Sequence, residues 1–378
     1  MTFIFYLMIF IVVYVYIGYY SLLRILEIFS KQKIIIGDYV PTVTLFVPVF
    51  NEEKMIRKKI ENSIGIDYPK EKIEIVFYSD SSSDETDKII NEYIGAGIKL
   101  YRADTRRGKN YLINNSFEKM NGDIIVFSDA NSLYRKDAIK LLVRSFIDQT
   151  VGCVCGKLVY ISDTNSLVGK GESLYFKYES ALKRLESAFG SVVTGNGAIY
   201  AIRKSLFSQL PEEVPNDFAH PIEIKAKGFK VIYEPLAIAE ERATASTTEE
   251  FRRRVRIVLR SFTAFIFYQK KYNILKNSYS FFFVSHKLLR WFIFPLMVVI
   301  FFINLSLNGY YANILLYIQY IFYISALIGC ICQRMDLKIK LFYVPFYFCL
   351  INLAGALGIL KYFVGKKEIM WDIAETTR

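Results

Sequence analysis

The stretch DIIVFSDANS, Asp123 to Ser132, decides the fold of this chain. Its apolar run, Ile124 to Phe127, stops just before a carboxylate, Asp129, and an amide, Asn131, follows two residues later. The run is short, β-branched or aromatic, and ends abruptly in polar side chains, which is typical of a buried strand. Such an ending suits either a turn or a metal ion with oxygen ligands.

Three earlier segments repeat this form: Thr42 to Phe50, Ile73 to Asp80, and Ile98 to Asp104. Charged segments with helical spacing lie between the four: Glu52 to Ile64, Asp84 to Tyr93, and Lys109 to Lys119. Near-continuous apolar strands that alternate with helices indicate a parallel sheet covered on both faces. Ligands bind such sheets at the carboxyl ends of the strands, so we expect the polar strand ends to line one cleft.

The usual glycine-rich nucleotide motifs are missing from these strand ends. Neither G-x-G-x-x-G nor G-x-x-x-x-G-K-[ST] follows any of the four strands, which excludes the common dinucleotide and P-loop sites. A different glycine-rich segment, TGNGAIYAIRK (Thr194 to Lys204), follows a helix-like segment and runs into another strand. By itself this segment is either a plain loop or part of a site.

The apolar residues gather in segments long enough for a membrane. Of the 378 residues, 53% are hydrophobic and 16% aromatic. Met1 to Leu23 carries no charge and exceeds the roughly 20 residues that a span needs. Trp291 to Gln333 is also uncharged, with a turn at Asn308 to Asn313 that leaves room for two spans, and Leu341 to Leu360 is a third candidate. The first segment lacks the charged start and cleavage site of a signal peptide.

The charge distribution predicts the orientation. Arg24, Lys31 and Lys33 follow the first apolar segment, which favours a cytoplasmic central domain in a multi-pass protein of the cell membrane. The net charge is +12, and many basic residues, such as those of Phe251 to Arg260, lie just before the later spans. Contact with anionic lipid headgroups explains them better than nucleic acid does. The five cysteines have no metal-binding spacing, which favours reduced thiols.

Six motifs together resemble the inverting family 2 glycosyltransferases over roughly Pro41 to Arg260. They are VPVFNEE (Val47 to Glu53), YSDSSSDET (Tyr78 to Thr86), RRGKNYLIN (Arg106 to Asn114), FSDAN (Phe127 to Asn131), TGNGAIYAIRK, and PND (Pro215 to Asp217). One apolar anchor before the domain and a block of spans after it resemble the membrane branch of that family. This branch includes hyaluronan, chitin-oligosaccharide and poly-N-acetylglucosamine synthases and ceramide glucosyltransferase.

The resemblance implies an α/β, A-type glycosyltransferase domain with a Rossmann-like, mostly parallel sheet, inserted between transmembrane helices. The expected divisions are an anchor (1–26), the transferase domain (41–248), a basic interfacial segment (249–286), a membrane block of about three spans (287–364) and a tail (365–378). The resemblance also implies a donor that is a nucleotide-diphosphate sugar, expected to be UDP-linked, and Mg²⁺ or Mn²⁺.

The resemblance assigns roles residue by residue. Donor binding falls to Glu52, Asp80, Lys109, Asp129, Arg253 and Arg256, metal binding to Asp129 and Asn131, acceptor binding to Gly195, Asn196 and Gly197, and base catalysis to Asp217. Inverting transfer independently needs a base for the acceptor hydroxyl and a counter-charge for the leaving diphosphate. Asp217 could instead cap a helix that begins near Phe218, and His220 is the next candidate for the base.

Three positions depart from the family pattern. Asn131 stands for the second Asp of the D-x-D motif, which lowers the negative charge but keeps an oxygen ligand. Asn216 stands for the Glu that often precedes the catalytic Asp, and Ile257 for the Trp of Q/R-x-x-R-W. Arg256 keeps the phosphate-binding half of that motif, whereas Ile257 loses the half that stacks on a sugar.

Two enzymatic functions and one non-catalytic function follow from these observations. The first is transfer to a growing polysaccharide, favoured by the tail GKKEIMWDIAETTR (Gly365 to Arg378), which resembles that of the synthases. The second is a single transfer to a lipid or lipid-linked acceptor, favoured by Ile257. A homo-oligomer or partner protein would complete a polymer channel. A non-catalytic transport or scaffold protein should have lost the carboxylates, and Asp80, Asp129 and Asp217 are all present.

Overall fold

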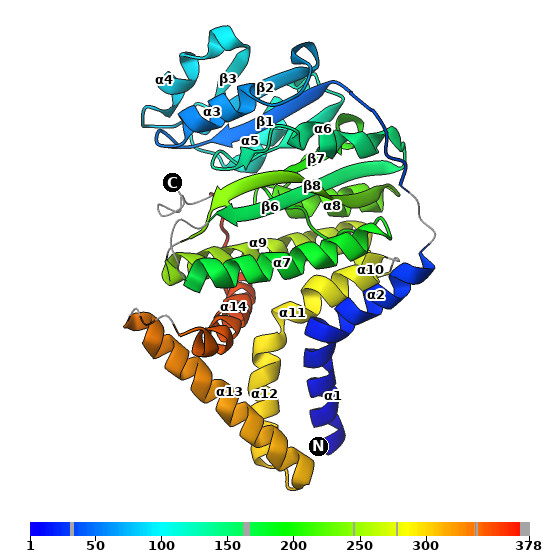
Figure 1. Cartoon of the computed structure of the whole chain (residues 1–378), viewed down its shortest axis with the longest axis vertical. Helices are drawn as coiled ribbons and strands as arrows, with labels where there is room; N and C mark the ends of the chain where they lie inside the picture. The colour runs from blue at the N-terminus through cyan, green and yellow to red at the C-terminus, as the bar shows by residue number, and fades with distance from the viewer. Residues whose placement is uncertain are drawn as a thin grey trace.

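The computed structural model describes residues 1–30, 34–161, 167–244, 246–276, 279–335, 337 and 339–370 (Figure 1). Within these residues, eight strands form one sheet in the order β3-β2-β1-β4-β7-β6-β8-β5. The strands are β1 (Val43–Val49), β2 (Ile73–Ser79), β3 (Ile98–Arg102), β4 (Ile124–Phe127), β5 (Leu133–Tyr134), β6 (Val151–Ile161), β7 (Tyr200–Arg203) and β8 (Lys230–Arg242).

The mostly parallel sheet expected from the four apolar runs is confirmed. Strand β1 pairs in parallel with β2 and β4, so that Val43 lies beside both Ile73 and Ile124, and β2 pairs in parallel with β3. Strand β7 runs antiparallel to β4 and β6, while β6 and β8 are parallel. Strand β4 is shorter than the run from Asp123 to Asn131, because the chain leaves the ladder after Phe127.

Both faces of the sheet are covered at its centre, where every residue of β1 and β4 is buried. Alternate residues of β1 enter two hydrophobic clusters: Leu45 and Val47 pack on one face, and Phe46 packs with Phe127 on the other. The helices beside the sheet are α3 (Ile56–Ile64), α4 (Thr86–Asn91), α5 (Lys109–Ser116), α6 (Ala138–Val143) and α8 (Asn216–Ala226). Because β1, β2 and β4 run parallel to one another, their carboxyl ends lie at one edge of the sheet.

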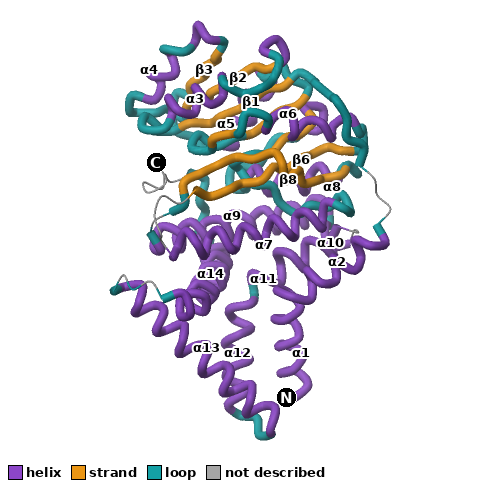
Figure 2. Tube along the Cα trace, in the orientation of Figure 1, coloured by secondary structure: helices purple, strands orange, loops and turns teal. Residues whose placement is uncertain are grey.

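Two longer helices, α7 (Leu167–Ser187) and α9 (Thr247–Tyr272), lie between the sheet and the apolar helices (Figures 1 and 2). Helix α9 begins where its sequence favours a start, because the Ser246 hydroxyl accepts a hydrogen bond from the Glu249 N–H at 3.4 Å. Glu249 and Glu250 in the first turn and Lys270 and Lys271 in the last turn oppose the helix dipole. The charges of this segment therefore stabilise one long helix.

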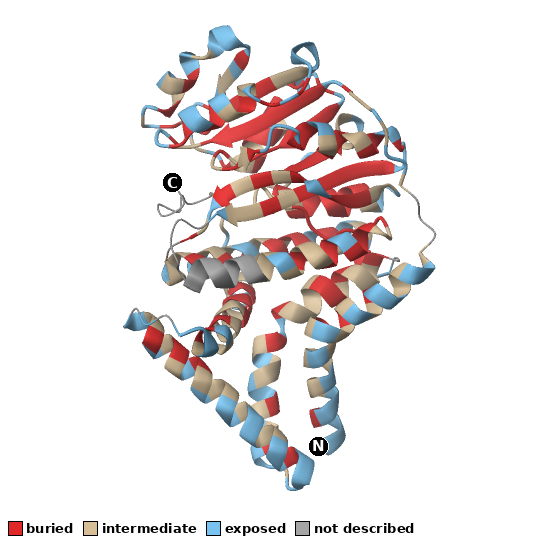
Figure 3. Ribbon diagram, viewed as in Figure 1, coloured by how far each residue is buried: buried red, intermediate tan, exposed pale blue. Residues whose placement is uncertain are grey.

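The apolar helices extend away from the domain. They are α1 (Thr2–Val13), α2 (Tyr19–Phe29), α10 (Tyr279–Phe283), α11 (Leu289–Trp291), α12 (Ile293–Leu305), α13 (Tyr310–Arg334) and α14 (Lys340–Phe363). Among the described residues, Thr2–Phe29, α13 and α14 are long and apolar enough to cross a membrane. Tyr279–Trp291 and Ile293–Leu305 form a pair bent by 61°, which has the form of either a broken span or a re-entrant loop. The loop between α12 and α13 covers residues 306–309, so it begins before the turn predicted at Asn308 to Asn313, and residues 310–313 already belong to α13. Figure 3 shows that much of the surface of these helices is exposed. Their exposed residues include large apolar ones, such as Phe302.

Two π-helical turns interrupt the apolar helices at the level of the domain. The turn η1 (Tyr14–Gly18) joins α1 to α2, and η8 (Val284–Leu288) joins α10 to α11. The two turns contact each other, because the Tyr14 hydroxyl lies 2.8 Å from the Ser285 hydroxyl. A π-turn widens a helix locally and changes the direction of its side chains, and such turns are frequent at functional sites.

The first residues of the tail contact the domain. Lys367 pairs with Glu213 at 2.9 Å, and a Cβ placed on Gly108 would lie 3.2 Å from the Ile369 carbonyl oxygen. The tail and the domain therefore lie on one side of any membrane that the helices cross, which requires an even number of crossings between them. With three apolar segments between the domain and the tail, this favours one segment that enters and leaves the membrane on the same side, over a tail on the side opposite the domain. Residues 371–378, which carry the synthase-like ending, lie outside the described residues.

Candidate active site

A cavity of ≈ 480 Å³ connects the carboxyl ends of the strands with the apolar helices. We call Pro48, Glu52, Lys109, Asp129, Ala130, Asn131, Gly197 and Ala198 its strand-end half. We call Tyr16, Tyr175, Phe176, Tyr178, Glu179, Arg254, Lys287, Arg290, Trp291, Ile351, Asn352 and Gly355 its helical half. Asp217, Arg256 and Arg260 also line it. This volume is in the range of small-molecule sites.

Asp129 stands at the end of β4 and is held by a lysine. The Lys109 Nζ lies 2.6 Å from Asp129 Oδ1, and Lys109 is the first residue of α5. Both side chains come from carboxyl-terminal strand ends or the loops that follow them, so the sheet brings them together. Of the polar strand ends expected to share one cleft, Glu52, Asp129 and Asn131 line this cavity, whereas Asp104 does not.

Gly197 lies against the other oxygen of the same carboxylate. A Cβ at this position would come within 2.7 Å of Asp129 Oδ2, closer than a carbon can approach an oxygen without displacement. The glycine-rich segment therefore acts as more than a plain loop, because its lack of a side chain leaves room for the carboxylate. Asn196 is fixed beside it by a hydrogen bond from its side-chain amide to the Gly156 carbonyl at 3.0 Å.

Asp80 is not in the wall of the cavity. Its fully buried carboxylate accepts hydrogen bonds from the Arg107 N–H at 2.8 Å and the Gly108 N–H at 3.0 Å. Gly108 has a φ of +94°, a conformation that favours glycine, and it directly precedes Lys109. Asp80 thus fixes the loop that delivers Lys109 to Asp129, so its contribution to the cavity is made through the backbone.

The oxygen atoms near Asp129 suit a hard divalent cation. Asp129 and Asn131 offer a carboxylate and an amide oxygen, which are ligands of the kind that Mg²⁺ and Mn²⁺ take. Among the described residues no group of three or more His, Cys, Asp and Glu side chains gathers as a complete ligand set. This fits a cation bound by one or two protein ligands together with substrate phosphates, rather than a structural metal centre.

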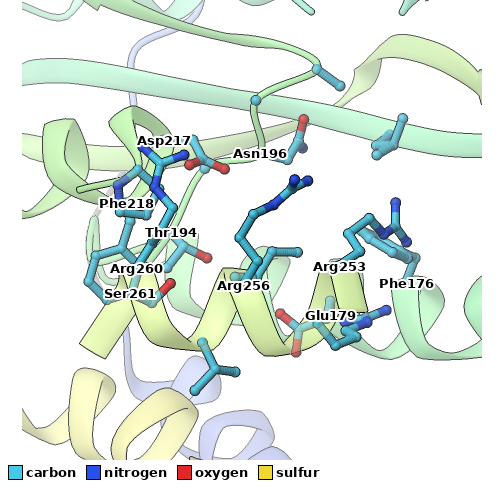
Figure 4. A pocket seen from close by; sticks show the side chains of 18 of the residues that line it. Phe176, Glu179, Thr194, Asn196, Asp217, Phe218, Arg253, Arg256, Arg260 and Ser261 are labelled. Atoms are coloured by element: carbon cyan, nitrogen blue, oxygen red, sulfur yellow. The ribbon is translucent and has the colours of Figure 1, made fainter. Parts of the chain in front are cut away.

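Asp217 belongs to the first turn of α8 and does not cap it. The helix begins at Asn216, its N-cap is Pro215, and the cap has no side-chain hydrogen bond. The backbone of Asp217 is tied to the glycine-rich segment, because its carbonyl accepts the Gly195 N–H at 2.8 Å. Figure 4 shows the carboxylate facing the cavity, between Asn196 and Arg260. The alternative that Asp217 is a helix cap therefore loses its support.

Burial sets the acid–base properties of the residues around Asp217. Burial raises the pKa of Asp217, an effect that Lys109 opposes and that the Asp129 charge reinforces. Burial lowers the pKa of His220 to about 3, and its Nδ1 lies 2.9 Å from the Tyr200 hydroxyl. His220 does not line the cavity, so Asp217 is the better placed of the two candidate bases.

Helix α9 presents arginines to the cavity at helical spacing. Arg253 pairs with Glu250 at 2.6 Å, and its guanidinium also donates to the Tyr160 hydroxyl at 3.1 Å. Arg256 points from α9 toward the loop that carries Asn196 (Figure 4). Ile257 also lines the cavity, where the family pattern would place an aromatic ring. The predicted pair of arginines is therefore brought to the same cavity as Asp129.

The sequence interpretation missed several charged side chains in or behind the wall of the cavity, among them Arg260 and Lys59. Arg260 follows Arg256 by one helical turn and donates to the Val214 carbonyl at 2.8 Å, so its spacing was an available signal. Lys59 is fully buried and donates to the Ser128 hydroxyl at 2.7 Å, just before Asp129. Burial lowers its pKa to about 7. Nothing distinguishes this lysine from the surface lysines of its amphipathic helix, so its role could not be foreseen.

Known proteins resemble this chain in sequence. The family description Glycosyl transferase family 2 matches residues 44–210. The probable glycosyltransferase YdaM of Bacillus subtilis is 28% identical over 64% of this chain and 62% of its own length. The beta-monoglucosyldiacylglycerol synthase of Synechocystis is 24% identical over 43% of this chain and 35% of its own length. The chain thus spans about a third to just under two thirds of these relatives.

A solved structure resembles the whole fold. The mannosyltransferase PcManGT from Pyrobaculum calidifontis, in complex with GDP-Man and Mn²⁺, superposes with a TM-score of 0.72. The similarity covers 96% of this chain and 99% of that protein, at 19% sequence identity. This likeness, together with the family match, shows that the predicted A-type glycosyltransferase fold is correct.

Proposed function

Because residues 44–210 match the family description Glycosyl transferase family 2, we propose that this chain transfers one sugar, with inversion, from a nucleotide-diphosphate sugar to a lipid or lipid-linked acceptor at the membrane surface. The observation that carries the proposal is the single cavity that joins Asp129 to Tyr16 and Asn352. A donor at the strand ends and an acceptor among apolar helices would share one space, with Asp217 between them.

The donor would occupy the strand-end half. Glu52 and Asp80 stand where the family holds the nucleoside, Asp80 acting through the loop that it fixes. Lys109 and Arg256 supply positive charge for the diphosphate, and a guanidinium can bind it through two hydrogen bonds. The match of Asp80 to a nucleoside contact favours a UDP-linked donor on family resemblance alone.

Asp129 and Asn131 would hold Mg²⁺ or Mn²⁺, and Gly197 keeps the space around the carboxylate open. When bound, the cation would neutralise charge on the leaving diphosphate. The protein itself adds Lys109, whose ammonium already lies 2.6 Å from Asp129 Oδ1 and can turn to a phosphate oxygen. Positive charge from both sources would stabilise the leaving group.

Asp217 is the proposed base. It would accept the proton of the acceptor hydroxyl while that oxygen bonds to the anomeric carbon of the sugar and the bond from this carbon to the diphosphate oxygen breaks. A carboxylate whose pKa burial has raised is a better proton acceptor than an exposed one. Its place between Asn196 and Arg260 puts it beside the acceptor loop (Figure 4).

The helical half favours a lipid acceptor over a growing polysaccharide, the product first expected from the synthase resemblance. Its wall is formed by α7, α9 and the apolar helices, and it includes the aromatic side chains of Tyr16, Tyr178 and Trp291, which suit a lipid at the membrane interface. The name of the Synechocystis relative describes a lipid product, which supports the same reading. Ile257 removes the family's sugar-stacking ring.

The test is transfer by the purified full chain in lipid nanodiscs, with a panel of radiolabelled nucleotide sugars and an organic extract of bacterial membranes as acceptor. We expect one donor to label an organic-soluble product that carries a single sugar, with Mg²⁺ or Mn²⁺ required and Asp217→Asn as the inactive control. Label found only in a long water-soluble polymer would support the polysaccharide alternative. Transfer to no acceptor by any donor would contradict the proposal.

A further inference from the structure

We infer that the helical half of the cavity contains a phosphate-binding subsite, formed by Arg254, Lys287 and Arg290, for the phosphate of an anionic lipid acceptor. This inference rests on the proposed function and makes it more specific, since it names the chemical group by which the acceptor is recognised. It assigns two arginines and a lysine outside the sequence motifs to the reaction.

Arg290 is the central residue of this subsite. Its side chain is nine-tenths buried, and one guanidinium nitrogen, Nη1, binds Glu179. Among the described residues its Nε and Nη2 have no hydrogen-bond partner. Two unsatisfied donors on a buried cation are costly, and a guanidinium presents these donors in the geometry that binds a phosphate through two parallel hydrogen bonds. Arg290 lines the cavity, so a ligand there can satisfy them.

Arg254, on helix α9, is likewise buried with a guanidinium nitrogen that lacks a hydrogen-bond partner among the described residues. Its side chain is also nine-tenths buried, and its Nε donates to Glu250 at 2.7 Å. Within the described part of the chain, its Nη2 has no partner. The guanidinium lies 4.1 Å from the ring centre of Tyr175, while that of Arg290 lies 5.1 Å from the ring centre of Tyr178. One face of α7 therefore contacts both arginines.

Lys287 and Glu179 complete the wall. The Lys287 Nζ lies 2.9 Å from Glu179 Oε2, so this one carboxylate faces both Lys287 and Arg290. His286 lies behind it, 3.1 Å from Glu179 and 2.6 Å from Glu186. Over the whole cavity, the described wall carries eight Lys and Arg side chains against five Asp and Glu side chains. This excess of positive charge favours an anionic occupant.

The two π-helical turns supply independent support. Turn η1 brings Tyr16 into the cavity and turn η8 brings Lys287 there, and the turns contact each other through Tyr14 and Ser285. Both interrupt apolar helices at the level of α7, because the Tyr178 hydroxyl donates to the Tyr16 carbonyl at 2.9 Å and Lys287 pairs with Glu179. A lipid phosphate at this level would keep its apolar chain beside α1 and α14, which an inorganic anion could not use.

The experiment measures binding through Trp291, which lines the cavity. The chain has two tryptophans, so Trp371→Phe leaves Trp291 as the single reporter. Farnesyl phosphate, farnesol and inorganic phosphate are titrated into this protein in nanodiscs. We expect farnesyl phosphate to change the Trp291 emission saturably, with farnesol and inorganic phosphate each binding at least roughly tenfold more weakly, because each lacks one half of the recognition.

Variants then test the side chains. Arg254→Gln and Arg290→Gln should each weaken farnesyl phosphate binding roughly tenfold or more, as the loss of a charge-assisted hydrogen bond to phosphate predicts. Arg290→Lys keeps the charge against Glu179 but removes the Nε and Nη2 donors. This variant should therefore fold, yet its affinity for farnesyl phosphate should be as weak as that of Arg290→Gln. Arg252→Gln, exposed on α9, should bind as the parent does.

The inference would be overturned by farnesol binding as tightly as farnesyl phosphate, or by unchanged farnesyl phosphate affinity in the arginine variants. Binding of inorganic phosphate as tight as that of farnesyl phosphate would also contradict it, since the site would then be one for free phosphate. Calorimetry of UDP and GDP with Mn²⁺ on the same proteins reports on the donor half alone. It distinguishes failure of this subsite from failure of the proposed function.

Discussion

The strand-end half and the helical half of the cavity are built in opposite ways. In the strand-end half, short loops after the strands hold each charged group in place, as the Asp80 backbone contacts do for Lys109. The helical half takes its residues from both ends of the chain, and the Tyr16 hydroxyl donates to Asn352 Oδ1 at 2.7 Å across 336 positions. The proposed donor site uses the strand ends with Lys109 of α5 and Arg256 of α9, whereas the proposed acceptor site also needs the apolar helices packed on the domain.

The largest expected effect follows from removing the metal-site carboxylate. Asp129→Ala should lower transfer about a thousandfold, because the loss of cation binding removes several kcal/mol of charge stabilisation from the leaving diphosphate. Radiolabel transfer at saturating Mn²⁺ measures this, and EDTA should have the same effect on the unchanged protein. Asp137→Ala, exposed at the start of α6, is the matched control. Full turnover in chelator would show that no cation is needed.

Arg256→Ala tests the junction between the two halves. Loss of the proposed diphosphate contact should weaken nucleotide binding and turnover together, by roughly 10- to 100-fold, as expected for a hydrogen bond between charged groups. Calorimetry of nucleotide binding and the transfer rate are both needed. Arg252→Ala, on the exposed face of the same helix, should leave both unchanged. A loss of turnover without a loss of nucleotide binding would move Arg256 to the acceptor side.

Gly197→Ala tests how closely the glycine-rich segment is fitted to Asp129. The new Cβ would lie 2.7 Å from Asp129 Oδ2 and displace a side chain rather than the backbone, so the protein should fold. We expect the Mn²⁺ concentration for half-maximal transfer to rise about tenfold, which corresponds to about 1.4 kcal/mol. Gly95→Ala, where a Cβ would meet nothing within 4 Å, is the control. An unchanged Mn²⁺ requirement would separate Gly197 from the metal site.

The smallest effect is expected from Tyr16→Phe, which removes one hydrogen bond between the first and last apolar helices. A net contribution of about 0.5–1.5 kcal/mol predicts a rise in the acceptor KM of roughly twofold to tenfold. Nucleotide binding should stay the same, because the strand-end half does not depend on these helices. Tyr6→Phe, exposed in the same span, serves as control. Equal losses in both halves would mean that they are not separable.

The sequence predicted the strand-end half well because its signals are local. Asp129 and Asn131 follow β4 and Glu52 follows β1, at boundaries that the apolar periodicity marks, and the parallel pairing of β1 and β4 places these two strand ends side by side. Glu52, Arg256 and the segment Gly195 to Gly197 also reach the cavity. Asp80 was expected in the wall and instead lies behind it. This could not be predicted, because its hydrogen bonds to the loop before Lys109 have no local signal in the sequence.

The helical half could not be predicted because its contacts join distant segments. Arg290 and Lys287 were interpreted as charges beside lipid headgroups, and only the packing of η8 against α7 brings them to Glu179. The π-helical turns leave no clear mark in the sequence, and the burial of Lys59 depends on tertiary packing. Periodicity identifies an apolar helix but not the helix that it contacts.

Asp217 is proposed to accept the proton of the acceptor hydroxyl at the point where the two halves of the cavity meet. Because burial raises the pKa of Asp217, the transfer rate should fall as the pH is lowered, before the pH reaches the range in which an exposed Asp titrates. A base must be deprotonated to act, so the loss lies on the acid side. The pH profile of kcat/KM checks this limb, and a profile that stays flat into the usual Asp range would contradict it.

The most direct measurement compares donor binding and turnover in Asp217→Asn. The substitution keeps the shape of the side chain and the first turn of α8 but removes the basic oxygen. We expect nucleotide-sugar affinity to be nearly unchanged and turnover to fall at least roughly a hundredfold, the lower range of general-base catalysis. Near-normal turnover in this variant would contradict the account and require a different base.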